Sequence, residues 1–323
     1  MNDHKKQAKI LHEQMKASGD IQSEQKLAEF LSAYEGSDKI VSSKDLTAQI
    51  EELENEARYK TGIESLDQIT DGFRSNQLVV IGSAPKSGKT QFSVELAKRI
   101  QKESGEKCTM FLFEETAPEV LYKYKKKGIE LPDFLTPAEL IEYNIDSVYR
   151  KMIEAWAKYD SKIFFIDHLH FLLGNSKRLD LDIKDVMQEL KKFAKMHGFT
   201  IFLITHLKMG NFMEPPGVDA IRDSSFIAQY ADTVIMLWRE IIQAGTDSHS
   251  NVTKQTKNML ANVILNRKIN FVTDDNTGLV ELTFNTDNWT YEEFLWYGAD
   301  MEEEQQEKTQ KKEKFSRIQS WVI

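Results

Sequence analysis

Short apolar runs alternate with amphipathic stretches along the chain from Tyr59 onward. The runs cover residues 78–81, 109–113, 163–166, 200–204, 233–237, 261–265 and 279–284. The early runs are continuous, which is typical of strands buried on both faces of a parallel sheet. Apolar residues at helical spacing follow Thr90 and recur over residues 184–197. Strands and helices in alternation predict an α/β fold with a mainly parallel sheet, and the last strands, which lack intervening helices, predict an antiparallel edge.

The segments on either side of this region are more polar. Residues 1–58 carry only weak apolar stripes at helical spacing, so we expect a short helical N-terminal arm or linker there, or a partly disordered leader. Residues 296–323 form a charged tail that we expect to be a solvated helix or disordered. The sequence therefore predicts three regions, 1–58, 59–295 and 296–323. The polar stretch 240–259 lies between two strand-like runs and predicts a long hairpin loop.

Composition narrows the class of protein mainly by exclusion. Hydrophobic residues make up 41% and aromatic residues 10%, which is enough for a sizeable core and too much for a disordered chain. No run approaches the ~18 apolar residues of a membrane span, and the charged N-terminus lacks the apolar centre of a signal peptide. A single cysteine, Cys108, excludes a disulfide framework and a Cys-rich zinc site, so we expect the cell interior as compartment. The net charge of −9 argues against a wholly basic nucleic-acid coat but is compatible with a local basic groove.

A phosphate-binding loop is the sharpest local feature. The apolar run 78–81 is followed by a loop and the first residues of a helix, namely Ser83, Ala84, Pro85, Lys86, Ser87, Gly88, Lys89, Thr90 and Gln91. Backbone N–H groups of such a loop, together with the helix dipole, bind an anion. Gly88 lets the backbone approach the phosphates, Lys89 would reach the β and γ phosphates, and Thr90 would hold Mg²⁺ through its hydroxyl. Ser83 stands where the strict pattern has glycine, and an ordinary strand-to-helix turn is the alternative.

Three further strands end in polar side chains. Asp167 follows the run 163–166, Glu114 and Glu115 follow the run 109–113, and His206 follows the run 200–204. Ligands of open α/β sheets bind at these carboxyl ends. Asp167 would bind the Mg²⁺ hydration shell or cap the next helix, and one of the two glutamates would polarise an attacking water or be a solvated surface acid. A lone histidine after a strand is more often structural, but three such strands beside a phosphate loop predict a nucleotide site.

The span from about Tyr59 to Tyr291 resembles the RecA-type motor domain of DnaB-like ring helicases. The resemblance is closest to the helicase half of phage primase-helicases and to mitochondrial Twinkle. It is carried by residues 61–67, 83–90, 113–115, 166–169, 205–208 and 221–233. Residues 83–90 resemble the DnaB form of the loop, which also lacks the first glycine. The resemblance implies a RecA-like P-loop NTPase core with ATP and Mg²⁺ as cofactors, Glu114 as the catalytic glutamate, Asp167 at the metal and His206 as a sensor.

The resemblance also implies residues at the base of the nucleotide and at the subunit interface. Arg239 falls on the position that stacks against adenine, and Phe284 is similar to the second base contact. A basic finger from the neighbouring subunit completes each site of the family, and the candidates are Arg267 and Lys268. We favour Arg267, because a planar guanidinium bridges phosphate oxygens. The longer turn after these residues departs from the family pattern and leaves the exact finger open.

Two loops that face the channel of the ring are implied to contact DNA. Lys208 and Asn211 lie in one of them, and Lys177 and Arg178 lie in the other. Basic side chains on phosphates bind DNA independently of its sequence, which suits a translocating motor. A solvated surface pair is the alternative for Lys177 and Arg178.

The function implied is that of an ATP-dependent replicative DNA helicase. Such a protein translocates on single-stranded DNA as a homohexameric ring, 5′ to 3′, in the cytoplasm of a bacterium or a phage-infected host cell. A primase, a helicase loader or a single-strand-binding protein would be separate partners, and no membrane is involved. The alternative is a RecA-fold ATPase of recombination or regulation, such as a mediator or a KaiC-like protein, without unwinding. A nucleotide-switched binding module with little turnover is a third hypothesis, and Glu114 argues against it.

Overall fold

A computed structural model of the 323-residue chain describes residues 10, 13, 21–32, 39–139, 142–173, 179–207, 216–217, 220–221, 224–243, 253–267, 271–272 and 278–293. The chain divides into two units, residues 1–56 and 57–323. Among its described residues, the first unit holds helix α2 (Ile21–Ser32), the short 3-10 helix η1 (Ser43–Leu46) and helix α3 (Thr47–Glu54). The Ser42 hydroxyl accepts the Lys44 N–H, and the Ser42 N–H donates to Asp45, which is a capping box. The tail 296–323 lies outside the described residues, and the predicted division into three regions remains a prediction.

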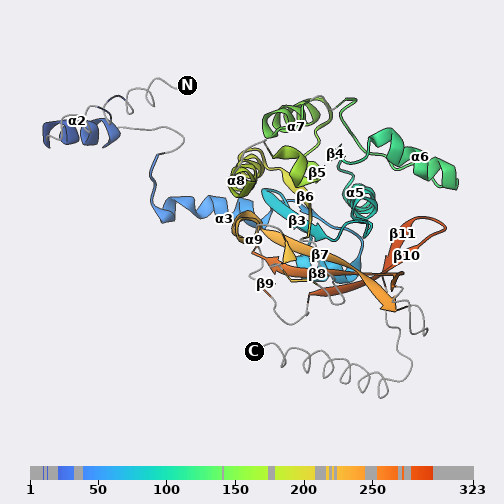
Figure 1. Cartoon of the computed structure of the whole chain (residues 1–323). Helices are drawn as coiled ribbons and strands as arrows, with labels where there is room; N and C mark the ends of the chain where they lie inside the picture. Colours follow the sequence, from blue (N-terminus) through green and yellow to red (C-terminus); the bar gives the residue numbers. More distant parts are fainter. Residues whose placement is uncertain are drawn as a thin grey trace, which may run out of the picture. The chain divides into compact units, whose positions relative to one another are not determined.

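The second unit is built on a nine-stranded sheet in the order β11-β10-β8-β7-β3-β6-β5-β4, with β9 beside β8 (Figure 1). Its strands are β3 (Gln77–Ser83), β4 (Cys108–Leu112), β5 (Ile163–Asp167), β6 (Thr200–His206), β7 (Thr233–Gln243), β8 (Thr253–Asn266), β9 (Phe271–Val272), β10 (Leu279–Asn285) and β11 (Thr290–Glu293). A separate pair is formed by β1 (Arg58–Tyr59) and β2 (Phe73–Arg74). Strands β4, β5, β6, β3 and β7 are parallel, and β8, β10 and β11 are antiparallel. The predicted α/β fold and its antiparallel edge are confirmed.

The predicted hairpin is confirmed, because β7 pairs with β8 antiparallel, but the predicted extent of its loop is wrong. The expected hairpin loop 240–259 is largely strand, because β7 continues to Gln243 and β8 begins at Thr253. An antiparallel pair at the side of a sheet is often solvated on one face, so its strands extend through polar sequence that carries no continuous apolar run. Only residues 244–252 of the expected loop lie outside these strands, and they are not among the described residues.

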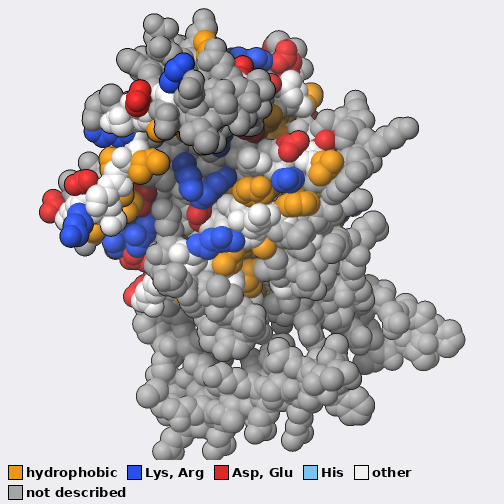
Figure 2. All heavy atoms as spheres, turned by 90° about the vertical axis from the view of Figure 1, so that its left-hand side faces the viewer, with side chains coloured by type: hydrophobic (Ala, Val, Ile, Leu, Met, Phe, Trp, Pro, Cys, Tyr) orange, Lys and Arg blue, Asp and Glu red, His pale blue; other side chains and the backbone are white. Residues whose placement is uncertain are grey.

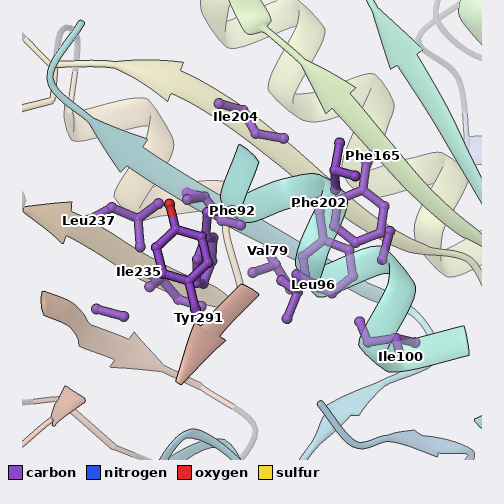
Figure 3. Close-up of a cluster of buried hydrophobic side chains, with 14 of the residues drawn as sticks. Val79, Phe92, Leu96, Ile100, Phe165, Phe202, Ile204, Ile235, Leu237 and Tyr291 are labelled. Carbon is purple, nitrogen blue, oxygen red and sulfur yellow. The ribbon is translucent and has the colours of Figure 1, made fainter. Parts of the chain in front are cut away.

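Helices cover both faces of the parallel strands. They are α4 (Glu64–Thr70), α5 (Lys89–Ser104), α6 (Ala117–Lys127), α7 (Ile145–Tyr159), α8 (Leu179–His197), α9 (Ser224–Tyr230) and the 3-10 helix η2 (Leu169–Leu172). Val79 packs with Leu96 and Ile100 of α5 on one face (Figure 3), while Leu78 and Val80 belong to the core shared with α7 and α8. Burial on both faces explains why the predicted runs are continuously apolar. Within the described part of the chain, no helix combines the length and apolar character needed to cross a membrane.

The last described strand is joined to the first helix of this unit. Helix α4 begins after Ile63, which offers no side-chain cap. The Glu293 carboxylate accepts hydrogen bonds from the N–H groups of Glu64 at 2.9 Å and Ser65 at 2.8 Å. A carboxylate at a helix N-terminus satisfies free N–H groups and interacts favourably with the helix dipole. A residue at the end of the sheet therefore caps a helix at its beginning.

Candidate nucleotide-binding and hydrolysis site

The predicted phosphate loop connects β3 to α5, as the sequence indicates. Gly88 has a φ of 94°, and a Cβ on it would lie 3.2 Å from the Tyr291 hydroxyl oxygen. Positive φ and close packing together require glycine at this position. The side chains of Ser83, Ser87 and Lys89 are buried, whereas Lys86 is exposed. The loop therefore has the strand, turn and helix N-terminus that bind phosphate groups.

Lys89 is the first residue of α5, and its side chain points to a carboxylate that follows strand β4. Its Nζ donates to Oε2 of Glu114 at 2.9 Å. The same oxygen lies 3.8 Å from Nε2 of His206 and 3.9 Å from Nε2 of His168. Glu115, the neighbour of Glu114, is bound by Lys123 instead. The geometry thus separates the two glutamates and places Glu114 alone against the phosphate loop.

Thr90 and Asp167 form a second polar pair beside the loop. The Thr90 hydroxyl donates to Oδ2 of Asp167 at 2.5 Å, and the aspartate side chain is buried. Burial raises the pKa of Asp167, against the opposing effects of the Thr90 hydrogen bond and the Lys89 charge. Its other oxygen, Oδ1, is buried without a hydrogen-bond partner among the described residues. A hydroxyl beside a carboxylate with a free oxygen fits Mg²⁺, which binds through such ligands and keeps several waters.

The charges at the site shift the pKa values of three side chains. Partial burial by itself raises the pKa of Glu114, but the hydrogen bond and charge of Lys89 outweigh it, so that the net shift is downward. Burial lowers the pKa of His168 to about 3, with the neighbouring His206, His170 and Lys89 adding to the effect. Burial and Lys89 also lower the pKa of His206. At neutral pH the carboxylate is therefore charged and both imidazoles are neutral.

Ligand atoms of Glu114, His168 and His206 all lie within 4.8 Å of one another, which is the spacing of a possible metal centre. The ring of His168 is held by the backbone N–H of His170, which donates to its Nδ1 at 3.3 Å. His168 is part of the aspartate-histidine signature, but sequence reasoning alone did not place it in the site. Its position directly after Asp167, at the end of a predicted strand, is the feature of the sequence that could have indicated its place in the site.

The predicted base contacts also lie near the loop. The Arg239 guanidinium carbon is 5.9 Å from the centre of the Phe284 ring, and an Arg239 nitrogen is 3.8 Å from the Cβ position of Gly88. Tyr291 packs against Phe284 at 5.0 Å and is fully buried, and its hydroxyl has no hydrogen-bond partner among the described residues. Burial raises the pKa of Tyr291. Sequence reasoning missed this tyrosine, because the short strand β11 carries no recognisable pattern.

Gln91 makes contacts within the protein in this structure. Its amide donates to the Tyr124 hydroxyl at 2.6 Å and to the Trp289 carbonyl at 3.1 Å. These bonds fasten α5 to α6 and to the turn between β10 and β11. Its expected contact with the nucleotide remains a prediction.

Arg267 lies at the other end of the sheet from its own phosphate loop. Asn266 pairs with Thr233, and Thr233 pairs with Val79 near the start of β3, whereas the loop follows Ser83 at the end of β3. Its guanidinium donates to the Ala228 carbonyl at 2.5 Å. An interaction with the chain's own nucleotide is therefore excluded by the register of the strands. The other predicted basic and polar contacts, Lys268, Lys177, Arg178, Lys208 and Asn211, lie outside the described residues.

Comparison with known proteins identifies the family to which this chain is similar. Residues 59–254 match the family described as the KaiC ATPase. A probable replicative DNA helicase of Trieres chinensis is 23% identical over 218 residues, which cover 57% of this chain and 48% of the helicase. The replicative DNA helicase DnaC of Bacillus subtilis is 21% identical over 246 residues, covering 64% of this chain and 51% of that protein. The circadian clock protein KaiC2 of Synechocystis sp. is 28% identical over 167 residues, covering 50% of this chain and 28% of that protein.

Solved structures show the same fold. One solved ATPase domain superposes with a TM-score of 0.63 at 17% identity, covering 79% of this chain and 99% of that domain. A DnaB-like replicative helicase, whose structure describes its interactions with primase, superposes with a TM-score of 0.61 at 17% identity, covering 89% of this chain and 76% of that one. The expected similarity to DnaB-like helicases and the RecA-like fold are confirmed. The chain spans about half the length of the two helicase relatives.

Proposed function

The chain belongs to the KaiC ATPase family, and we propose that it is an ATP-hydrolysing motor of the DnaB helicase type. The observation that carries the proposal is the arrangement around the phosphate loop. Lys89 and Thr90 start α5, and their side chains meet Glu114 and Asp167 at the carboxyl ends of parallel strands. A lysine, a hydroxyl and two carboxylates in this order are the parts that phosphoryl transfer to water requires.

Each side chain has a separate role in the proposed hydrolysis of ATP. Lys89 binds the β and γ phosphates, and the backbone of residues 84–88 cradles them. Thr90 and Asp167 would hold Mg²⁺, which supplies charge neutralisation on the phosphate oxygens when it is bound. Glu114 accepts a proton from the attacking water, because its lowered pKa keeps it ionised at neutral pH. Arg239 and Phe284 hold the adenine base.

Movement on DNA is proposed from the relatives and from the sequence resemblance. Replicative helicases match this chain at 21–23% identity, which supports movement on DNA. We infer a homohexameric ring around single-stranded DNA with 5′ to 3′ polarity. Arg267 lies at the opposite end of the sheet from the chain's own phosphate loop, so its proposed role as a finger requires a second subunit. A primase, a loader or a single-strand-binding protein would act as separate partners.

We propose that a few loops bind DNA, rather than the surface of the chain as a whole. On the face drawn in Figure 2, lysine and arginine side chains are interspersed with acidic and hydrophobic ones. The chain as a whole has a net charge of −9, so that phosphate binding depends on particular loops. We assign that role to Lys208 and Asn211, and to Lys177 and Arg178.

A regulatory ATPase is the second candidate. The family match and the 28% identity to KaiC2 favour it. A protein of that kind has the same phosphate loop and sheet but does not unwind DNA. The two candidates differ in whether DNA changes the rate of ATP hydrolysis.

ATP hydrolysis with and without single-stranded DNA tests the proposal, together with strand displacement from a forked duplex. A helicase hydrolyses ATP faster with DNA and opens the fork, and Lys89→Ala abolishes both activities. Lys102→Ala, an exposed lysine near the end of the same helix, serves as the matched control and leaves both unchanged. Hydrolysis that DNA does not affect would overturn the helicase proposal in favour of the regulatory one. Absence of hydrolysis under all conditions would overturn both.

A further inference from the structure

Three donors converge on a single oxygen atom in the site. Oε2 of Glu114 lies 2.9 Å from Nζ of Lys89, 3.8 Å from Nε2 of His206 and 3.9 Å from Nε2 of His168. The lysine and His168 are buried, and they come from different elements, α5 and the residue after β5. The glutamate is different, since its side chain is 47% exposed. A half-exposed acidic side chain thus lies where these donors meet.

The hydrogen bonds of the two rings indicate which nitrogen carries the proton. Nδ1 of His168 accepts the backbone N–H of His170 at 3.3 Å, so its Nε2 carries the hydrogen in the neutral ring. Nδ1 of His206 is buried without a partner among the described residues. A proton on that atom would leave a buried donor unsatisfied, which is costly, and the proton therefore belongs on Nε2. Both rings present an N–H group toward the carboxylate oxygen.

This donor set suits an anion better than a metal ion. A metal ion needs the lone pair of Nε2, and it would force a proton onto Nδ1 of His168, where a backbone N–H already points. The Lys89 ammonium would also repel a cation placed between the three side chains. An oxyanion, in contrast, accepts from all three groups at once.

We propose that His168 is a direct ligand of the terminal phosphate of ATP, together with Lys89 and His206, and that the carboxylate of Glu114 takes the place of this phosphate when ATP is not bound. The inference rests on the proposed ATPase function and extends it to selectivity. An entering γ phosphate competes with Glu114 for the same donors and releases the glutamate toward the attacking water. ADP lacks the group that makes this exchange. The site therefore distinguishes ATP from ADP, because only the γ phosphate of ATP replaces the Glu114 carboxylate.

Nucleotide affinities measured without DNA test the proposal. The affinity for a β,γ-imido analogue of ATP and the affinity for ADP are compared by competition with a fluorescent ADP derivative. We expect His168→Leu to weaken binding of the ATP analogue about 10-fold and to leave ADP binding unchanged, because one hydrogen bond to a charged group is lost. His168→Gln keeps an N–H donor and should restore most of the affinity. Glu114→Gln should tighten binding of the ATP analogue about 10-fold, since a neutral amide competes less well for Lys89.

A matched control and four contrary outcomes complete the test. His197→Asn alters a histidine that contacts Tyr149, far along α8, and should leave the ratio of the two affinities unchanged. Equal weakening of both nucleotides in His168→Leu, or no change in either, overturns the proposal. A visible absorption band on titration with Co²⁺ that His168→Gln removes would show a metal centre and would also overturn it. If the wild-type protein binds neither nucleotide, the ATPase proposal itself fails, and this result is distinct from the others.

Discussion

Buried polar side chains at the two ends of the parallel strands differ in whether they have hydrogen-bond partners. At the amino end, Asp232 accepts hydrogen bonds from the N–H of Leu78 at 2.7 Å and from Lys191, and Gln77 donates to Thr233 at 2.6 Å. At the carboxyl end, the described structure gives no hydrogen-bond partner to Oδ1 of Asp167, Oγ1 of Thr205 or Nδ1 of His206. Both ends belong to the same sheet and hold buried polar side chains. Asp232 and Gln77 at the amino end are satisfied within the described chain, whereas these three atoms at the carboxyl end are not, and Nε of Arg74 beside Gln77 is an exception at the amino end.

The hydrogen-bonded side chains at the amino end contribute to stability, whereas the polar atoms at the carboxyl end are available to a ligand. A buried polar atom without a partner costs about 1–3 kcal/mol, and a ligand that binds at the carboxyl end would remove this cost. Such costs persist at functional sites, and the predicted phosphate, metal and sensor residues lie at this end. The amino end avoids this cost at Asp232 and Gln77, because the strands and helix around them satisfy both side chains. Substitutions at the two ends should therefore affect different measurements.

The largest expected effect is on catalysis at the carboxyl end. Glu114→Gln should lower the rate of ATP hydrolysis by about 10³-fold, because the amide no longer accepts a proton from water. Its thermal unfolding should stay close to that of the wild type, since the side chain is about half exposed. Glu115→Gln is the control, because its carboxylate pairs with Lys123 outside the site. A rate that survives in Glu114→Gln would assign the base to another residue.

At the amino end the large effect should be on stability. Asp232→Ala removes a buried partner of Lys191 and leaves the Leu78 N–H unsatisfied, so we expect a loss of about 3 kcal/mol in the free energy of unfolding. Urea denaturation measures it. Glu189→Ala breaks an exposed pair with Lys192 and should cost less than about 1 kcal/mol. Similar losses in the two variants would contradict the contrast between the ends.

A smaller effect is expected on the pH dependence of stability. The pKa of His168 is lowered from 6.5 to about 3 in the folded protein, so the unfolded chain binds more protons between these values. Stability that is present at pH 7 is therefore lost as the pH falls through 6.5, by about 1–2 kcal/mol at pH 5. Denaturation at pH 7 and pH 5 should show a smaller difference for His168→Gln than for the wild type. Equal differences would argue against a buried neutral imidazole.

The smallest effects come from a matched pair of buried threonines, one in β7 and one in β6. Thr233→Val leaves the Gln77 amide without its acceptor and should cost about 1–2 kcal/mol. Thr205→Val removes a hydroxyl that has no partner in the described structure, and it should be neutral or slightly stabilising. Melting temperatures of the two variants measure the contrast. A greater loss for Thr205→Val would show that its hydroxyl contributes to stability.

The sequence predicts the parallel part of the fold well, because burial on both faces leaves continuous apolar runs. Strands β1, β2 and β9 have two residues each and β11 has four, which is too short for periodicity to indicate them. The convergence of Lys89, Glu114 and Asp167 could be predicted, since parallel strands end at one edge.

The contacts of Tyr291 and His168 could not be predicted from the sequence. The position of Tyr291 depends on the register of antiparallel strands, and the orientation of the His168 ring depends on a backbone N–H two residues later. The location of Arg267, at the end of the sheet away from the phosphate loop, could likewise not be predicted without the direction of β8. The positions of these three side chains depend on strand pairing or on local backbone geometry, and the pattern of apolar residues predicts neither.

The cap that Glu293 provides for α4 has a consequence for synthesis of the protein. The bonded residues, Glu64 and Glu293, are 229 positions apart, so the helix is translated long before its cap. At typical elongation rates this delay is roughly 10–50 s. During that time the phosphate loop and the parallel strands are available to fold, while α4 lacks its partner. Completion of the unit therefore waits for strand β11 to leave the ribosome.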